Sequence, residues 1–389
     1  MTQSTTLSSF QHLAAELRLY CGEDSLKALA KELQRSGCRR AVVVSGRSVQ
    51  SSAAMDELRA AIGPALVGES ITVRPNSPVA AVEVTARALA EMRADAVIAV
   101  GGGSAAVTAR AASILLAEQR PVQELCTRRL ANGQFESPRL GAAKIVQFVV
   151  PTTPSTAFVK AGSAVHDEAS GQRLALFDPK TRAKALFVHP AFLRTAPAGL
   201  VQEAALNTLS TTIEALESPR CDPFSEAMLT HALRLVARHL AQVSVQDEAA
   251  RQALVMAAML CGRGTEQAGG GLASVLAHAI GHRVHVSNGT VNAIVLPQTM
   301  RFNAPVTTHT TSRIAQALSG SNSPGATAVD ALGALLATLD TPRRLRDIGL
   351  TRTELEPIAQ AAMSDWFISR SARPITQASE ISAILEAAW

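Results

Sequence analysis

A fully apolar pentapeptide that runs directly into three glycines constrains this chain more than any other feature. Residues 96–100 (AVIAV) are followed by Gly101-Gly102-Gly103-Ser104 and then by helical spacing of apolar residues over 105–118. A strand that is apolar on both faces must be covered on both sides, which is typical of a parallel sheet between helices. The sequence therefore predicts a strand, a tight glycine turn and a helix within an α/β domain.

The rest of the first half repeats this alternation. Strands are expected at 39–46, 71–74, 96–100 and 145–150, and helices at 23–36, 53–62, 78–93 and 105–118. The polar stretch 119–144 predicts a surface loop or hairpin near the ligand edge of the sheet. Whether this stretch acts as a lid stays open.

The second half is helical throughout. Helices are expected at 199–217, 223–243, 247–262, 270–282, 291–303, 310–318, 326–338, 352–363 and 377–388. Pro190 and Pro197 mark the change of pattern. We therefore expect a Rossmann-like α/β domain over 1–190 and an all-α domain over 191–389.

Composition excludes several classes of function. The 37 Lys+Arg and 32 Asp+Glu residues are dispersed, and aromatic residues make up only 3%, so nucleic-acid binding has little support. No charge-free apolar run is long enough to span a membrane, and the first residues do not resemble a signal peptide. Five cysteines without CxxC spacing fit a reducing compartment. We expect a cytoplasmic protein.

The glycine turn is the first candidate site. Glycines allow close approach of a ligand, and a helix that begins there offers free N–H groups to a phosphate. A simple strand–helix turn is the alternative, but it needs only one or two glycines. We interpret Gly101, Gly102, Gly103 and Ser104 as a phosphate-binding turn.

Two other strand ends add candidates for cofactor binding. Gly46 and Arg47 follow the first strand without an acidic neighbour, so this turn either accepts a 2′-phosphate or is an ordinary exposed turn. The choice between NAD and NADP stays open. Thr152, Thr153 and Ser155 follow the strand at 145–150.

In this order, several motifs resemble the iron-containing (group III) alcohol dehydrogenase superfamily, which is related to dehydroquinate synthase. They are Gly101-Gly102-Gly103-Ser104, Pro151-Thr152-Thr153, Ile213-Glu214-Ala215-Leu216, the segment 271–292, and Leu296-Pro297 leading to Asn303. Within the superfamily the chain is most similar to maleylacetate reductases, through Leu206-Asn207, Arg313-Ile314-Ala315, the segment 345–350 and the terminal Ala387-Ala388-Trp389. The resemblance implies hydride transfer with a nicotinamide cofactor on the glycine turn, a substrate in the cleft between domains, and a homodimer.

Most members of that family bind a divalent metal through one Asp and three His. The resemblance places Asn207, Thr211, Ser274 and Asn288 at these four positions. Amides and hydroxyls carry no charge to offset the dehydration of Fe²⁺ or Zn²⁺. We therefore predict a metal-free site.

His278 matches a family histidine near the nicotinamide, which makes it a candidate proton donor beside Asn207 and Thr211. A satisfied helix histidine is the alternative. His278, His282 and His285 also form a rival candidate zinc site, but no HExxH pattern accompanies them.

The family's Gly-Ser-Glu stretch is replaced here by Thr156-Ala157-Phe158, with Lys160 two residues further on. Phe158, Lys160, Ser274, His282 and Asn288 are the substrate-binding candidates. Lys160 and Arg173 would be counter-charges for an anionic substrate, although a solvated Lys160 is the alternative.

The leading hypothesis is a metal-independent NAD(P)(H)-dependent oxidoreductase, similar to maleylacetate reductase, that acts on a small carboxylated substrate. Two alternatives remain: a metal-free lyase, isomerase or cyclase on the same scaffold, and a non-catalytic homologue that binds dinucleotide.

Overall fold

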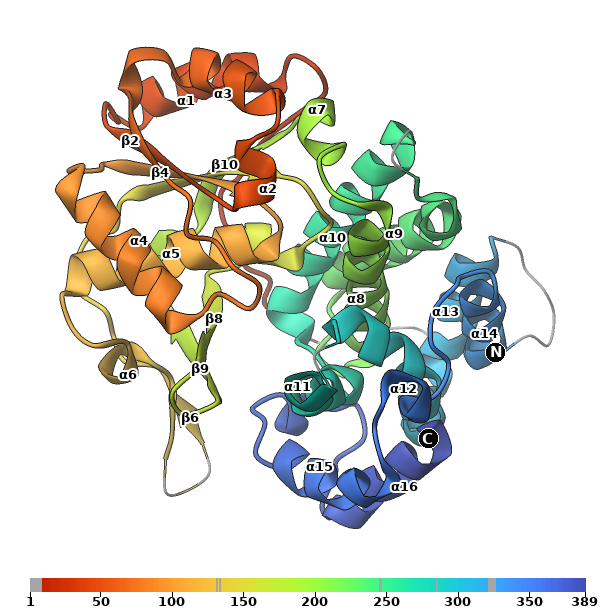
Figure 1. Ribbon diagram of the computed structural model, residues 1–389. Helices are drawn as coiled ribbons and strands as arrows, with labels where there is room; N and C mark the ends of the chain where they lie inside the picture. Colours follow the sequence, from red (N-terminus) through yellow and green to blue (C-terminus); the bar gives the residue numbers. More distant parts are fainter. Residues whose placement is uncertain (1–8, 131, 133, 245–246, 285, 321–326) are drawn as a thin grey trace.

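A six-stranded sheet organises the first half of the protein (Figure 1). The computed structural model describes residues 9–130, 132, 134–244, 247–284, 286–320 and 327–389. Every pair of neighbouring strands is parallel. The spatial order is β1 (Arg18–Cys21), β10 (Ala183–Val188), β7 (Val146–Pro151), β4 (Ala96–Gly101), β2 (Ala41–Ser45) and β3 (Leu66–Ser70).

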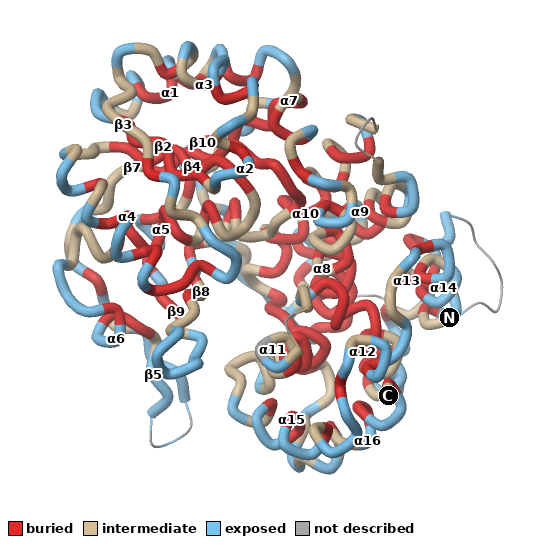
Figure 2. The backbone as a smooth tube through the Cα atoms, viewed as in Figure 1, coloured by how far each residue is buried: buried red, intermediate tan, exposed pale blue. Residues whose placement is uncertain are grey.

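Helices cover both faces of this sheet, as the apolar strands require. Helices α1 (Leu29–Arg35) and α3 (Ala54–Ile62) lie on one side, and α4 (Val79–Glu91) and α5 (Gly103–Glu118) on the other (Figure 1). Successive side chains of β2 alternate between the two layers: Val42 and Val44 pack with α4 and α5, whereas Val43 packs with α1 and α3. In Figure 2 the central strands are buried along their length.

The second half consists of helices around one apolar cluster that draws on residues from Ala196 to Ala388. Its longer helices are α8 (Ala198–Glu217), α9 (Pro223–His239), α10 (Glu248–Ala268), α11 (Leu272–Val284), α12 (Asn288–Asn303), α13 (Thr308–Ser319), α14 (Ala328–Ala337), α15 (Leu355–Ala362) and α16 (Ala378–Ala388). The predicted fold class, a parallel α/β sheet followed by helices, is confirmed.

The strand expected at 71–74 is wrong. The strand β3 lies earlier, at Leu66–Ser70, where the polar pattern LVGES concealed it. Gly68 makes room for the Met92 side chain, since a Cβ there would lie 2.2 Å from the sulfur. Glu69 accepts a 2.7 Å hydrogen bond from Arg59 Nε, which accounts for a carboxylate in a strand.

Smaller elements complete the first half of the chain. The excursion 119–144 contains a short helix, α6 (Val122–Leu125), and a two-stranded hairpin of β5 (Arg128–Arg129) and β6 (Phe135–Glu136), in keeping with the expected hairpin. A second hairpin, β8 (Gly162–Asp167) with β9 (Gln172–Phe177), was not expected, nor were the sheet strands β1 and β10. Two four-residue helices, α2 (Arg47–Gln50) and α7 (Pro190–Leu193), follow β2 and β10. Within the described residues, no helix is long and apolar enough to cross a bilayer.

Candidate functional site

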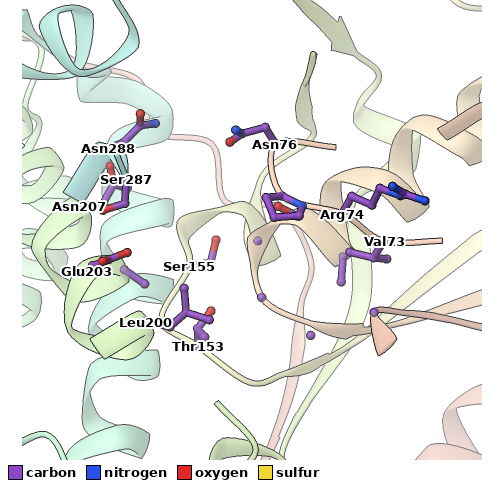
Figure 3. A pocket seen from close by; sticks show the side chains of 18 of the residues that line it. Val73, Arg74, Asn76, Thr153, Ser155, Leu200, Glu203, Asn207, Ser287 and Asn288 are labelled. Carbon is purple, nitrogen blue, oxygen red and sulfur yellow. The ribbon is translucent and has the colours of Figure 1, made fainter. Parts of the chain in front are cut away.

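A cleft of about 810 Å³ lies between the carboxyl edge of the sheet and the helical half. In Figure 3, Asn207 and Asn288 lie on one side of it, and Val73, Arg74 and Asn76 on the other. Ligands collect at this edge in open parallel sheets because strand ends and helix N-termini converge there.

The glycine turn forms the floor of this cleft. Gly101 has φ +144°, a backbone conformation that side chains rarely permit. A Cβ on Gly102 would lie 2.8 Å from Thr153 Oγ1, and one on Gly103 would lie 2.6 Å from Ser155 Oγ. Helix α5 begins at Gly103, two residues earlier than expected, so Gly103 and Ser104 belong to its first turn. The turn is therefore a cradle, kept open by glycines, beside the N–H groups of a 16-residue helix.

The other candidates for cofactor binding divide into two groups. Gly46, Ser104, Thr152, Thr153 and Ser155 all line the cleft. Arg47 is exposed and is not among the lining residues.

Arg74 lines the cleft near Gly46 instead, in the segment after β3. This segment is held at the turn by Ser77, whose hydroxyl donates a 3.1 Å hydrogen bond to the Ser104 carbonyl oxygen. Sequence reasoning missed Arg74 and Asn76 because they belong to a turn of irregular conformation, in which Asn76 has φ 61°.

A second cavity, of about 1220 Å³, adjoins the cleft. Five residues line both spaces: Ala164, Arg173, Asn207, His278 and Asn288. A ligand on the glycine turn and a ligand in the second cavity would therefore meet at the same wall. We call the second space the helical cavity, because much of its lining comes from the helical half.

The four positions at which the family resemblance expects metal ligands meet in the helical cavity. Asn207, Thr211, Ser274 and Asn288 all line it. Asn207 Oδ1 accepts a 3.0 Å hydrogen bond from Asn292 Nδ2, which leaves the Asn207 amide N–H groups available to a ligand. The Thr211 hydroxyl donates to the Asn207 carbonyl oxygen at 2.8 Å.

Close packing of α12 on α8 brings these groups together. A Cβ on Gly289 would lie 1.8 Å from the Glu203 carbonyl oxygen and 3.2 Å from the Asn207 backbone nitrogen. Only glycine permits this approach, which places Asn288 beside Asn207. In the sequence, the feature that corresponds to this close approach is the Asn288-Gly289 pair at the start of α12.

These donors do not fit a transition-metal ion. Two amides and two hydroxyls offer neutral oxygen only, and Ser274 Oγ is committed to Glu214 Oε2 at 2.6 Å. Across the described part of the chain, no group of three or more His, Cys, Asp or Glu side chains is placed to hold a metal ion.

His278 lies on α11, and its imidazole Nδ1 is 2.8 Å from Asp365 Oδ2. The other Asp365 oxygen accepts the backbone N–H of Phe367 at 2.8 Å, so the carboxylate is fixed from two directions. Sequence reasoning missed Asp365, which is 87 positions away and carries no local motif. His282 also lies on α11, but its side chain and His285 are outside the described residues.

Two buried carboxyls of α8 lie behind the cavity wall. Glu214 accepts hydrogen bonds from Ser274 N at 3.0 Å and from Ser274 Oγ. Burial raises the pKa of Glu214 to about 7. Burial raises the pKa of Glu217 to about 8, and the nearby Glu214 contributes to the same direction of shift. Both groups therefore resist ionisation in the folded protein.

The segment after β7 contributes Lys160 but not Phe158. Lys160 is half-buried and lines the helical cavity, and burial lowers the pKa of its ammonium group. The Phe158 ring, expected in the substrate pocket, is fully buried in the apolar core instead. The buried Arg110 holds this segment by donating to the carbonyl oxygens of Ala157 and Gly162, both at 2.6 Å.

Comparison with known proteins agrees with this geometry. Residues 17–190 match the iron-containing alcohol dehydrogenase family, and residues 202–389 match the C-terminal part of the Fe-containing alcohol dehydrogenase family. The probable alcohol dehydrogenase EutG of Salmonella typhimurium is 27% identical, over 92% of this chain and 90% of its own. The NAD-dependent methanol dehydrogenase of Bacillus methanolicus is 24% identical, over 88% and 91% respectively.

The crystal structure of maleylacetate reductase from Agrobacterium tumefaciens shares the fold. The two structures superpose with a TM-score of 0.81 and the sequences are 22% identical, over 98% of this chain and 99% of the reductase chain. The family matches together extend over nearly the whole sequence, from residue 17 to residue 389. The chain therefore belongs to the iron-containing alcohol dehydrogenase family.

Proposed function

We propose that this protein is a metal-independent NAD(P)(H)-dependent oxidoreductase that reduces the carbonyl group of a small carboxylated substrate, or oxidises the corresponding alcohol. The observation that carries the proposal is the wall shared by the cleft and the helical cavity, where His278, Asn207 and Asn288 face both spaces. The fold shared with maleylacetate reductase supports the choice of substrate.

The residues of the cleft fit a dinucleotide. The cradle at Gly102 and Gly103 has room for a phosphate where any side chain would collide with Thr153 or Ser155. A nicotinamide dinucleotide bound there would supply or accept the hydride. The two cavities adjoin at Asn207 and His278, and the reacting carbon of the substrate would lie at that wall.

His278 would act as the proton donor in the reduction. With Nδ1 hydrogen-bonded to Asp365, the proton passes from Nε2 to the carbonyl oxygen as the alcohol forms. The Asp365 carboxylate holds the imidazole in one orientation and stabilises its protonated form. In the oxidation direction the same atom accepts the proton from the alcohol.

Neutral donors would polarise the carbonyl in place of a cation. Asn207 Oδ1 is occupied by Asn292, so its Nδ2 is the group left to donate. The Asn288 amide lines the same wall. Thr211 is less suited as a donor because its hydroxyl proton is already directed to the Asn207 carbonyl oxygen. Aligned amide donors of this kind stabilise a developing oxyanion.

The test is turnover by protein purified in the presence of EDTA. NADPH or NADH oxidation at 340 nm would be followed with maleylacetate and with short keto acids, and metal content would be measured by mass spectrometry. We expect turnover at less than stoichiometric metal that added Fe²⁺ or Zn²⁺ does not increase. Activity that appears only with added metal would refute metal independence. Substrate conversion without a change at 340 nm would favour the non-redox alternative.

A further inference from the structure

The helical cavity carries an excess of positive charge that the proposed hydride transfer does not use. Its lining includes two carboxylates, Glu266 and Asp365, and six cationic side chains: Arg129, Lys160, Arg173, Arg182, Arg220 and Arg370. Glu266 pairs with Arg182, and Asp365 pairs with His278. Among the residues that the structure describes, the other five cations have no carboxylate oxygen within ion-pair distance.

Two of these cations converge on one point. A Cβ on Gly269 would lie 3.2 Å from Arg370 Nη1 and 3.7 Å from Arg220 Nη2. Gly269 has φ +84° at the end of α10, and a Cβ there would also lie 3.0 Å from Arg370 Cδ, so a side chain at this position would crowd the arginine pair. Burial lowers the pKa of Arg370, and the positive charge of Arg220 lowers it further. The two groups therefore repel one another in the ligand-free protein.

Separate elements hold this arrangement in place. Arg220 follows α8 in a turn fixed by Ser218, whose hydroxyl donates to the Ala268 carbonyl oxygen at 2.8 Å. Arg370 ends the short helix Ile368–Arg370. Arg370 is half-buried, and Arg220 is exposed at the rim of the cavity. Two planar guanidinium groups that lie beside the same glycine and line the same cavity can together bind the oxygens of a carboxylate.

The remaining cations lie in two groups. Lys160 lines the same cavity, and the charges of Glu266, Arg370 and Arg110 all act on it. Arg173 instead lies at the wall shared by both cavities, and the charge of Asp365 acts on it. The cavity thus offers one positive group near His278 and another beside Gly269.

We propose that Arg220 and Arg370 form a distal anion subsite that binds a carboxylate far from the reacting carbon, so that the ligand of this cavity carries two carboxylates. The assignment of the reacting end to His278 rests on the proposed function. The subsite itself does not, because it is defined by the arginine pair alone. Binding of the distal carboxylate relieves the repulsion between the two guanidinium groups.

Binding of matched anions to the full-length protein tests this. Succinate and butyrate have the same carbon number and differ by one carboxylate, as do glutarate and pentanoate. Dissociation constants would be measured by calorimetry at low and high salt for the wild type, Arg220→Gln, Arg370→Gln and the control Arg234→Gln. Arg234 is exposed on α9 and does not line either cavity. NADP⁺ and NAD⁺ binding would be measured in parallel.

We expect the wild type to bind each dicarboxylate at least about tenfold more tightly than its monocarboxylate, with the preference weakened by salt. Arg220→Gln or Arg370→Gln would reduce dicarboxylate affinity by about ten- to a hundredfold, with dinucleotide affinity unchanged. Ligand-free Arg370→Gln would unfold at the same or a higher temperature than the wild type, because a repulsion is removed.

Equal affinity for mono- and dicarboxylates would overturn the proposal, as would equal losses in Arg234→Gln and Arg370→Gln. Dicarboxylate binding in a protein that shows no hydride transfer would refute the proposed function and leave the subsite in place. If substrates with one carboxylate were turned over with the same kcat/KM as those with two, the distal subsite would be refuted and the proposed function would stand.

Discussion

His278 Nδ1 lies 2.8 Å from Asp365 Oδ2, and this contact joins α11 to the segment that follows α15. The imidazole also lines both the dinucleotide cleft and the helical cavity. A histidine in contact with a carboxylate at such a position is suited to proton transfer. Under the proposed function, this pair would supply the acid–base group beside the amides and hydroxyls of Asn207, Thr211, Ser274 and Asn288.

Removal of either partner should slow the chemical step. We expect His278→Gln to lower kcat by about a hundredfold or more, and Asp365→Asn by about tenfold or more, because the protonated imidazole loses its carboxylate. The pH profile of kcat, with the exposed Asp340→Asn as control, checks this. An unchanged kcat in both variants would remove His278 from the mechanism.

Filling the glycine cradle should weaken dinucleotide binding. A Cβ on Gly103 would meet Ser155 Oγ at 2.6 Å, so Gly103→Ala must displace the Ser155 side chain. We expect at least about a tenfold increase in the dissociation constant for dinucleotide, measured by fluorescence titration. The control is Gly333→Ala on α14, where a Cβ meets nothing within 4 Å. This change should stabilise its helix by about 1 kcal/mol and leave binding intact.

The choice of dinucleotide should depend on Gly46 and Arg74. Both line the cleft without an acidic neighbour after β2, so we expect NADPH to be preferred over NADH. Gly46→Asp should reverse the preference, because a carboxylate there binds ribose hydroxyls and repels a 2′-phosphate. A Cβ on Gly46 comes no closer than 3.6 Å to Val73 O, so the side chain fits.

Arg74→Gln should lower kcat/KM for NADPH and not for NADH, by about tenfold. Arg47→Gln, which alters an exposed residue outside the cleft lining, is the matched control. Equal effects of the two substitutions would contradict the assignment of Arg74.

Stability should fall as pH rises, because of the buried carboxyls. Burial raises the pKa of Glu217 from its usual value to about 8, so the folded protein keeps a proton that the unfolded chain loses. The stabilisation is complete below the unfolded pKa, near 4.5, and is lost as pH rises through about 8. Each pH unit in this window costs up to about 1.4 kcal/mol.

Glu217→Gln should flatten this dependence. Its neutral side chain can still accept the 2.7 Å hydrogen bond that Asn303 Nδ2 donates to Glu217. The free energy of unfolding, measured with urea between pH 5 and pH 9, is the observable. If the free energy of unfolding depended on pH in the same way in the wild type and in Glu217→Gln, Glu217 would not be the source of the pH dependence.

Elements with strong local patterns were predictable from the sequence. The strand 96–100 is apolar on both faces and lies within β4, and the three glycines that follow leave no alternative to a tight turn. The strand β3 was missed because Gly68 and Glu69 owe their places to Met92 and Arg59, which lie elsewhere in the chain. Local pattern carries no information about such partners.

The residues of the candidate site also fall into those that local sequence predicts and those that it does not. Gly102, Thr153 and Ser155 follow strands directly, so the carboxyl edge of the sheet collects them. Asp365, Arg370 and Arg74 reach the site through turns whose conformation depends on packing between distant segments. Phe158 was misplaced because the sequence shows the type of side chain at a position but not which way it faces.

The wall shared by the two spaces has a kinetic consequence. Since Asn207, His278 and Asn288 border both, a dinucleotide in the cleft forms part of the surface that the other reactant contacts. A substrate that bound first would lack this part of its contact surface at the shared wall and would bind more weakly than it does to the dinucleotide complex. Turnover should therefore be ordered, with dinucleotide the first to arrive and the last to depart.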